Sequence, residues 1–307
     1  MNKLRLDELL VKKGYYASID DASRAIHAGK VRCGTDVLQH PAMRIATDAD
    51  LAVIVEKRYV SRGGIKLEGA LSDFDFDVSG LNCLDVGAST GGFTDCLLQH
   101  GAAHVTAVDV AYGQLAWQLR QDARVSVYER CNISKIELSK LGNTHFNLIV
   151  ADVSFSPLSR LLPILQKFAG DLGHDAIADV VNRGVSAETL EHGVSADNVD
   201  ACNNFDSFLI ALCKPQFELP KSMVKDGVII DAKAHEQALS QVLNAAQKSR
   251  WQPKMLSVSH LRGPKGNIEF FFLMQFVQTQ GLDTAANHVN IDVSATVLDA
   301  HARFNNR

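Results

Sequence analysis

The chain has no long apolar run and no close pair of cysteines. Its longest apolar runs, Phe208–Cys213 and Phe270–Met274, are far shorter than the stretch of about 20 residues that a membrane-spanning helix needs. The six cysteines lie far apart among 307 residues, so neither a zinc site nor a disulfide framework is indicated. The first ten residues include acidic side chains and lack the apolar segment of a secretory signal. We therefore expect a reduced, cytoplasmic protein with no bound metal.

Basic residues are concentrated near the amino terminus. Residues 1–66 contain twelve Lys and Arg against eight Asp and Glu, whereas the rest of the chain contains nineteen against twenty-seven. A basic head on an acidic body suggests that the head meets a polyanion. A solvated basic face without a partner is the alternative. With 46% apolar residues, the chain can form one large domain and a small one.

Residues 1–57 predict a small α+β domain. Two short helices are expected first, ended by Gly14 and Gly29, with Ser18 as the cap of the second helix. Short strands are expected at 31–33, 37–38 and 51–55. The apolar residues expected to be buried in the two helices are Leu6, Leu9, Leu10, Ala22, Ala25 and Ile26. Residues 58–68, which are basic and rich in glycine, are expected to form a hinged linker.

Residues 69–277 alternate between strand-like and helix-like segments, which predicts βαβ units and a mostly parallel, Rossmann-like sheet. Ligands of such sheets bind at the carboxyl ends of the strands. The seven expected strands are 81–86, 105–108, 125–128, 147–151, 208–213, 254–259 and 269–275.

Two segments depart from this alternation. Residues 169–207 contain eight acidic residues and one Arg and repeat GVSAE as GVSAD, so we expect an insertion that is mobile or has short helices of its own. Residues 278–307 are polar. Only Val293, Val297 and Phe304 suggest a helical stripe there, and we expect an extension outside the core.

The string LDVGASTGGFTD predicts a strand, a glycine turn and the start of a helix. Glycines let a ligand approach the backbone, and the helix start offers free N–H groups. Asp109 follows Gly87 by twenty-two residues, at the end of the next strand, where an acidic residue binds ribose hydroxyls in nucleotide sites. The candidate cofactor residues are Asp85, Gly87, Ser89, Thr90, Gly91, Gly92, Phe93, Asp109 and Val110.

Asp85 indicates which cofactor the turn would take. A carboxylate just before the turn would repel a diphosphate, but it could meet a cationic amino group or sulfonium. S-adenosylmethionine has both and no phosphate. The alternative is that Asp85 only caps a helix or turn.

Five strings carry a resemblance to a known family. In order they are RYVSRGG-KL, LDVGASTGGFTD, ADVSF, KPQFE and GPKGN-EF. Together they closely resemble the hemolysin A (TlyA-like) family, whose members join an S4-type RNA-binding domain to a methyltransferase domain of the FtsJ type. The similarity covers about residues 3–276, apart from the acidic insertion.

The resemblance implies an S-adenosylmethionine-dependent ribose 2′-O-methyltransferase that acts on ribosomal RNA, at cytidine, and that has ribosomal RNA or ribosomal subunits as partners. The family's catalytic Lys-Asp-Lys-Glu tetrad falls on Lys66, Asp152, Lys214 and Glu269. Orientation supplies much of the rate of such a displacement. A neutral lysine can act as base toward the ribose hydroxyl, and a charged one can stabilise the developing oxyanion. We expect Lys214 to be the central group, with Asp152 and Glu269 directing its ammonium and Lys66 adding positive charge and an RNA contact.

Two departures from the family pattern concern RNA recognition. S4 domains commonly begin their second helix with Ser-Arg, but here the pair is Ser18-Ile19. The acidic insertion replaces a short loop before KPQFE, which puts the substrate range in doubt. The basic residues that remain as candidate RNA contacts are Arg5, Lys12, Lys13, Arg24, Lys30, Arg32, Arg58 and Arg62.

Other functions are compatible with parts of the sequence. The family name suggests a membrane-active cytolysin, although no long apolar or strongly amphipathic basic helix supports it. An RNA-binding ribosome-assembly factor without catalysis would not need the intact tetrad and glycine turn. A methyltransferase for transfer RNA or a small molecule is an alternative within the enzyme class, and the S4-like head favours a structured RNA.

Overall fold

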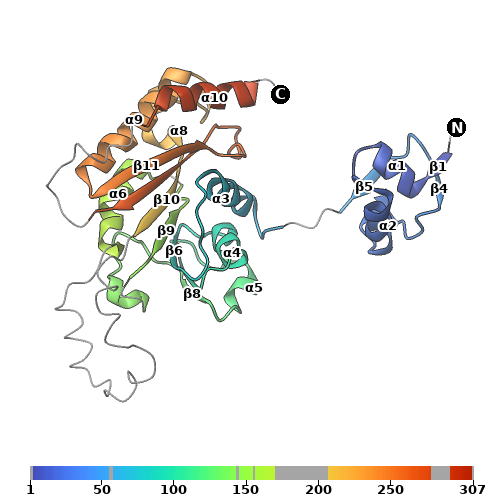
Figure 1. Ribbon diagram of the computed structural model, residues 1–307, viewed down its shortest axis with the longest axis horizontal. Coiled ribbons are helices and arrows are strands. Elements are labelled where there is room, and N and C mark those ends of the chain that lie inside the picture. Colours follow the sequence, from blue (N-terminus) through green and yellow to red (C-terminus); the bar gives the residue numbers. More distant parts are fainter. Residues whose placement is uncertain are drawn as a thin grey trace, which may run out of the picture. The chain divides into compact units, whose positions relative to one another are not determined.

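The computed structural model describes residues 3–54, 58–142, 145–154, 156–169, 207–277 and 291–305. The chain divides into two compact units, Met1–Arg58 and Tyr59–Arg307, which can be followed by colour in Figure 1. Each unit has its own hydrophobic core.

The first unit packs two helices, α1 (Leu6–Lys12) and α2 (Ile19–His27), against short strands. Five of the six residues expected to be buried in these helices belong to its core. The sixth, Ala25, is also buried. The strands form a pair, β1–β4, and a three-stranded sheet in the order β3-β2-β5. Their bounds are β1 Lys3–Arg5, β2 Val31–Cys33, β3 Asp36–Val37, β4 Arg44–Ala46 and β5 Leu51–Val53.

The predicted helix ends of this unit are confirmed. Ser18 Oγ accepts a hydrogen bond from the backbone N–H of Asp21 at 3.1 Å, which satisfies a free donor of the first turn. Gly14 and Gly29 follow the two helices with φ of +76° and +68°, values that favour glycine. The pair β1–β4 was not predicted, because its strands are three residues long and their sequences, KLR and RIA, lack a run of apolar residues.

The second unit is built on a seven-stranded sheet in the order β11-β12-β10-β9-β6-β7-β8. Strands β10, β9, β6, β7 and β8 are parallel, and β12 is antiparallel to both β10 and β11. The strands are β6 Asn82–Val86, β7 His104–Val108, β8 Val125–Tyr128, β9 Leu148–Ala151, β10 Phe208–Cys213, β11 Trp251–Val258 and β12 Phe270–Phe276. The predicted fold class, a mostly parallel Rossmann-like sheet of seven strands with a small α+β head, is therefore confirmed.

Helices cover both faces of this sheet (Figure 1). Successive strand residues point to opposite faces, so Leu84 belongs to one core and Cys83 to the other. Helices α6, α9 and α10 contribute to the first core, and α3, α4 and α5 to the second. The helices and 3-10 turns are α3 Arg62–Asp73, α4 Gly92–Gln99, α5 Trp117–Arg120, η1 Leu138–Leu141, α6 Leu158–Leu165, η2 Gln166–Phe168, α8 Pro215–Glu218, η6 Lys221–Met223, α9 Ala232–Lys248 and α10 Val293–Asn305.

The expected linker 58–68 is in large part helix, which corrects the prediction. Helix α3 begins at Arg62, and Ser61 caps it by accepting a hydrogen bond from the N–H of Gly63 at 3.3 Å. A side chain on Gly64 would overlap the ring of Tyr59. The glycines of this segment therefore allow close packing and do not form a hinge.

The carboxyl-terminal extension also differs from the prediction. Helix α10 packs against α9 and β11, and Val297 and Ala300 are fully buried. The three apolar positions that suggested a helical stripe were therefore a core face of the second unit. The predicted acidic insertion, 169–207, lies almost wholly outside the described residues.

Candidate active site

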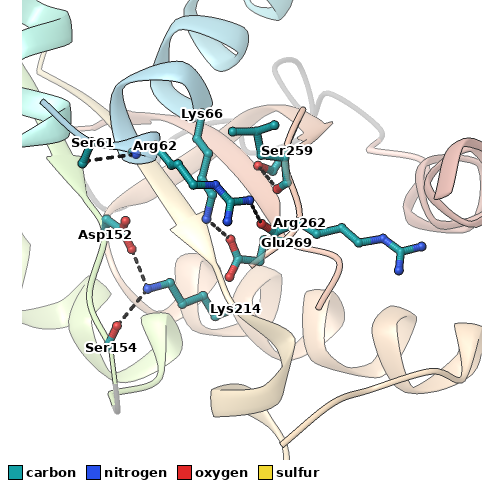
Figure 2. Close-up of polar contacts among 11 residues, drawn as sticks. Ser61, Arg62, Lys66, Asp152, Ser154, Lys214, Ser259, Arg262 and Glu269 are labelled. Carbon is teal, nitrogen blue, oxygen red and sulfur yellow. Dashed lines mark hydrogen bonds and ion pairs between the residues drawn. The ribbon is translucent and has the colours of Figure 1, made fainter. Parts of the chain in front are cut away.

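The four strands β7, β6, β9 and β10 end at one edge of the sheet because they are parallel neighbours. Four of the expected site segments follow these ends directly: the turn that starts at Gly87 after β6, Asp109 after β7, Asp152 after β9 and Lys214 after β10. Glu269 immediately precedes β12, which is antiparallel to β10, so it reaches the same edge. Lys66 comes from α3. Figure 2 shows the four tetrad side chains converging from these elements.

Lys66 and Glu269 form a buried ion pair. Lys66 Nζ lies 2.5 Å from Glu269 Oε2, and the two side chains are 8% and 0% exposed. Taking two charges out of water is costly, and direct pairing offsets that cost only while both partners are present. The pair therefore links α3 firmly to the start of β12, across 203 positions of sequence.

Lys214 and Asp152 form a second ion pair, which is partly open to solvent. Lys214 Nζ lies 2.6 Å from Asp152 Oδ1, and the side chains are 11% and 24% exposed. The same ammonium donates a hydrogen bond to Ser154 Oγ at 3.0 Å (Figure 2). The tetrad is thus two pairs, and Glu269 contacts Lys66. Our expectation that Glu269 directs the ammonium of Lys214 was wrong, because the carboxylate precedes β12 on the side of α3.

The glycine turn packs closely against two of the segments that carry the tetrad, the end of β9 and the start of α3. Gly87 has φ of +85°, and a Cβ there would come within 2.7 Å of the carbonyl oxygen of Asp152. Gly91 has φ of +92° and caps α4, and a side chain on it would overlap Leu119. A side chain on Gly92 would overlap Ser61 at the start of α3. The glycines let the turn, the strand end that carries Asp152 and the helix that carries Lys66 approach one another.

Asp109 organises the outer side of the turn. One carboxylate oxygen accepts a hydrogen bond from the N–H of Ser89 and the other from the N–H of Ala111, both at 2.7 Å. Asp109 is half-buried and each oxygen has a further lone pair, so it can also accept from ribose hydroxyls. The neighbouring Val110 is 69% exposed.

The other predicted cofactor residues differ in how far their side chains are exposed to a ligand. Ser89 and Thr90 are exposed on the turn. Phe93 is 3% exposed and packs in the core, with its ring 6.1 Å from that of Phe271. Only the backbone of Phe93 is therefore placed to contribute to a ligand site.

Asp85 is completely buried beneath the turn. Its Oδ2 accepts a hydrogen bond from Thr94 Oγ1 at 2.6 Å, and its Oδ1 has no donor among the described residues. Burial raises the pKa of Asp85 to about 7, since desolvation disfavours the carboxylate and the hydrogen bond from Thr94 offsets only part of this. A cationic group close to this carboxyl would favour its charged form and lower the pKa again.

Two polar residues next to the tetrad were not singled out from the sequence. Ser154, in the string ADVSF, contacts Lys214. Glu218, in KPQFE, is buried, and its carboxylate accepts hydrogen bonds from the N–H groups of Leu158 at 2.5 Å and Ser159 at 3.4 Å. It thereby caps α6 from another element. No spacing rule pointed to either role, because both contacts join segments about 60 residues apart.

The candidate RNA contacts of the first unit include several residues with protein partners. Arg5 pairs with Asp7 at 2.7 Å, Arg24 pairs with Asp21, and Lys13 donates to the carbonyl of Ala49 at 2.7 Å. Lys12 and Arg32 are exposed, Lys30 is half-buried, and Arg58 and Arg62 are exposed near the start of the second unit. Arg62 donates to the carbonyl of Arg262 at 3.0 Å.

A family model described as FtsJ-like methyltransferase matches residues 59–276, which is most of the second unit and contains the whole tetrad. The chain belongs to the FtsJ-like methyltransferase family.

Named relatives extend the similarity to both units. A protein of Mycobacterium tuberculosis named 16S/23S rRNA (cytidine-2′-O)-methyltransferase TlyA is 37% identical over 89% of this chain and 90% of its own length. Hemolysin A of Brachyspira hyodysenteriae is 34% identical over 87% of this chain and 98% of its own length. A solved structure of a candidate hemolysin from Streptococcus thermophilus has a TM-score of 0.66 and 32% identity, covering 100% of this chain and 98% of that one.

Membrane-spanning helices and metal clusters are both absent from the described ranges. No helix there combines the length and the apolar content needed to cross a bilayer. No group of three or more His, Cys, Asp or Glu side chains in those ranges is arranged to hold a metal ion.

The raised pKa of the buried Asp85 carboxyl predicts that the stability of the protein depends on pH. Since the pKa of Asp85 in the folded protein is about 7 against an ordinary 3.8, the folded state binds more protons than the unfolded state between these values. The contribution of Asp85 to stability therefore falls as pH rises through that window. We expect the Tm of Asp85→Asn, relative to the unmutated protein, to increase from pH 4 to pH 8 in calorimetry.

Asp77→Asn is the matched control. Asp77 is an exposed carboxyl whose pKa is lowered by hydrogen bonds from Ser79, so its window lies below pH 4 and its Tm difference should stay flat from pH 4 to pH 8. A flat difference for Asp85→Asn as well would contradict a raised pKa at that site.

Proposed function

We propose that this protein is an S-adenosylmethionine-dependent methyltransferase of the ribose 2′-hydroxyl of ribosomal RNA, with cytidine as the target nucleotide. The observation that carries the proposal is the convergence of Lys66, Asp152, Lys214 and Glu269 beside the glycine turn, in a chain of the FtsJ-like methyltransferase family. The similarity over about nine tenths of the chain to an enzyme named for cytidine 2′-O-methylation of 16S and 23S rRNA supports the substrate. Acting on ribosomal RNA or ribosomal subunits, the enzyme would work in the cytoplasm.

The residues around the turn fit S-adenosylmethionine better than a dinucleotide. Bound there, the cofactor supplies an electrophilic methyl group on a sulfonium. Asp109 is available for its ribose hydroxyls, and the backbone around Gly87 and Gly91 leaves room for close approach. The buried Asp85 carboxyl, whose Oδ1 has no donor among the described residues, favours a cationic ligand over a diphosphate.

Lys214 is the residue we assign to the reacting hydroxyl. Among the described residues its ammonium contacts Asp152 and Ser154. A lysine head group has three donor positions, and we assign the third to the ribose oxygen. A 2′-hydroxyl must lose its proton as the new bond forms. In the neutral form Lys214 takes that proton, and in the charged form it stabilises the developing negative oxygen.

Lys66 and Glu269 have a different part in this mechanism. Their pair is almost completely buried, so it holds α3 and the start of β12 in a fixed geometry beside Lys214. The positive charge of Lys66 adds to the field at the site, where a low dielectric strengthens electrostatic interactions. Orientation and electrostatics together are the main sources of rate for such a transfer.

The hemolysin names of two relatives supply a second candidate, a membrane-active cytolysin. Release of an entrapped dye from liposomes distinguishes it from the methyltransferase. Dye release by the Lys214→Ala variant equal to that of the unmutated protein, together with no methyl transfer by either, would favour the second candidate.

Lys214→Ala should abolish methyl transfer while cofactor affinity remains close to that of the unmutated enzyme. A group that acts at the reacting hydroxyl affects kcat and has little effect on ground-state cofactor binding, and general base catalysis alone contributes about 10²–10⁴-fold. Tritium transfer from labelled S-adenosylmethionine to unmethylated ribosomal subunits measures turnover, and calorimetry measures cofactor affinity.

Lys221→Ala is the matched control, because Lys221 is an exposed lysine of η6 seven positions further along the chain. It should retain full turnover. If Lys214→Ala kept more than about a tenth of the turnover, a loss smaller than general base catalysis provides, Lys214 would not be the central group.

Removal of residues 1–57 should weaken RNA binding and reduce its salt dependence. We propose that this unit is an S4-type RNA-binding domain. Each Lys or Arg that faces a phosphate adds about 0.7–0.9 to the slope of log K against log salt. Filter binding to ribosomal RNA from 50 to 200 mM salt, compared between the full chain and the truncated one, gives the two slopes. Equal slopes would show that the first unit does not contact RNA.

A further inference from the structure

The loop between β11 and β12 forms one wall of the candidate active site. It ends at Glu269, whose carbonyl accepts a hydrogen bond from the N–H of Ser259 at 2.9 Å. Within the loop, the N–H of Gly263 donates to the carbonyl of Asn267 at 2.9 Å. A side chain on Gly263 would overlap Oε1 of Glu269, so the loop backbone lies directly against the carboxylate that pairs with Lys66.

The loop also contacts both ends of α3, the helix that carries Lys66. At the first turn, Arg62 Nη2 donates to the carbonyl of Arg262 at 3.0 Å. At the last residue, the carboxylate of Asp73 lies 3.0 Å from His260 Nε2. With the Lys66–Glu269 pair between these two contacts, the position of the loop determines how α3 presents Lys66.

Arg262 connects this loop to the carboxyl-terminal helix. Its backbone carbonyl accepts from Arg62, whereas its guanidinium points away from the tetrad (Figure 2). Nη2 donates to the carbonyl of Phe304 at 2.5 Å, and the guanidinium carbon lies 4.9 Å from the centre of the Phe304 ring. A cation at the end of a helix satisfies free carbonyls and interacts favourably with the helix dipole.

Helix α10 is a firm support for this contact. Val297 and Ala300 are fully buried, and Phe304 is 8% exposed. The helix is therefore held to the body of the domain on one face, and its last turn is held to the loop through Arg262.

We propose that Arg262 is a positioning residue of the methyltransferase site. By binding the end of α10, Arg262 holds the β11–β12 loop in place. The loop in turn holds Glu269 and Lys66 in the arrangement that catalysis requires. The proposal rests on the function proposed above. The described contacts of Arg262 are with Arg62 and Phe304 and involve neither the turn at 87–93 nor Asp109, so we expect its replacement to leave cofactor affinity unchanged. Loss of the contact loosens the geometry of the tetrad, and a displacement of about 1 Å can reduce turnover about 100-fold.

The test compares Arg262→Ala and Arg262→Lys with Arg303→Ala. Arg303 is an exposed arginine one residue before Phe304, and its described partner is the surface residue Asp299. Turnover is measured on unmethylated ribosomal subunits and normalised to the fraction of protein that binds S-adenosylmethionine by calorimetry. We expect kcat to fall about 10–100-fold in Arg262→Ala with cofactor affinity within twofold, a partial recovery in Arg262→Lys, and no change in Arg303→Ala.

Hydrogen exchange supplies a readout that does not depend on activity. The amides of residues 259–268 should exchange faster in Arg262→Ala and at the normal rate in Arg303→Ala. If Arg262→Ala folds poorly, Phe304→Ala removes the ring and keeps the carbonyl, and it should show the same changes to a smaller degree. Normal kcat in Arg262→Ala with an active unmutated enzyme would overturn the positioning role, whereas inactivity of the unmutated enzyme would instead overturn the proposed function.

Discussion

The buried ion pair between Lys66 and Glu269 is the interaction on which the arrangement of the site depends. It joins a helix that precedes the whole seven-stranded sheet to the start of β12, the last of the described strands. An unpaired charge in such a place would be costly, since removal of one partner of a buried pair typically destabilises a protein by about 3–5 kcal/mol. The pair therefore fixes α3, and with it the start of α4 and the glycine turn, relative to the strand ends that carry Asp152 and Lys214.

Two different kinds of ion pair divide the work of the proposed catalysis. The Lys66–Glu269 pair is nearly inaccessible, which suits a structural charge that also contributes a field. The Lys214–Asp152 pair is partly exposed, which suits a group that must reach a substrate hydroxyl. The glycine turn lies against Asp152 through Gly87, so a methyl donor on the turn and an acceptor at Lys214 would meet at one edge of the sheet.

The sequence predicted the sheet well and the contacts between segments poorly. All seven strands of the second unit were predicted within a few residues, because most are short runs rich in apolar and β-branched residues that alternate with helical segments. The strand ends placed Asp152 and Lys214 together for the same reason. The pairing of Glu269 with Lys66 did not follow, because a lone Glu at a strand start gives no signal of its partner. The core face of α10 and the capping of α6 by Glu218 were missed because both depend on packing between distant segments.

The central claim is that Lys66 and Glu269 act as one unit. A double-mutant cycle on Lys66→Met and Glu269→Gln tests it most directly, with the free energy of unfolding and kcat measured for all four proteins. We predict that each single change strongly destabilises the protein. The double change should recover much of the lost stability, because no buried charge remains unpaired. All three variants should lose methyl transfer. Additive losses of stability in the double variant would show that the two residues are not coupled and would contradict the account.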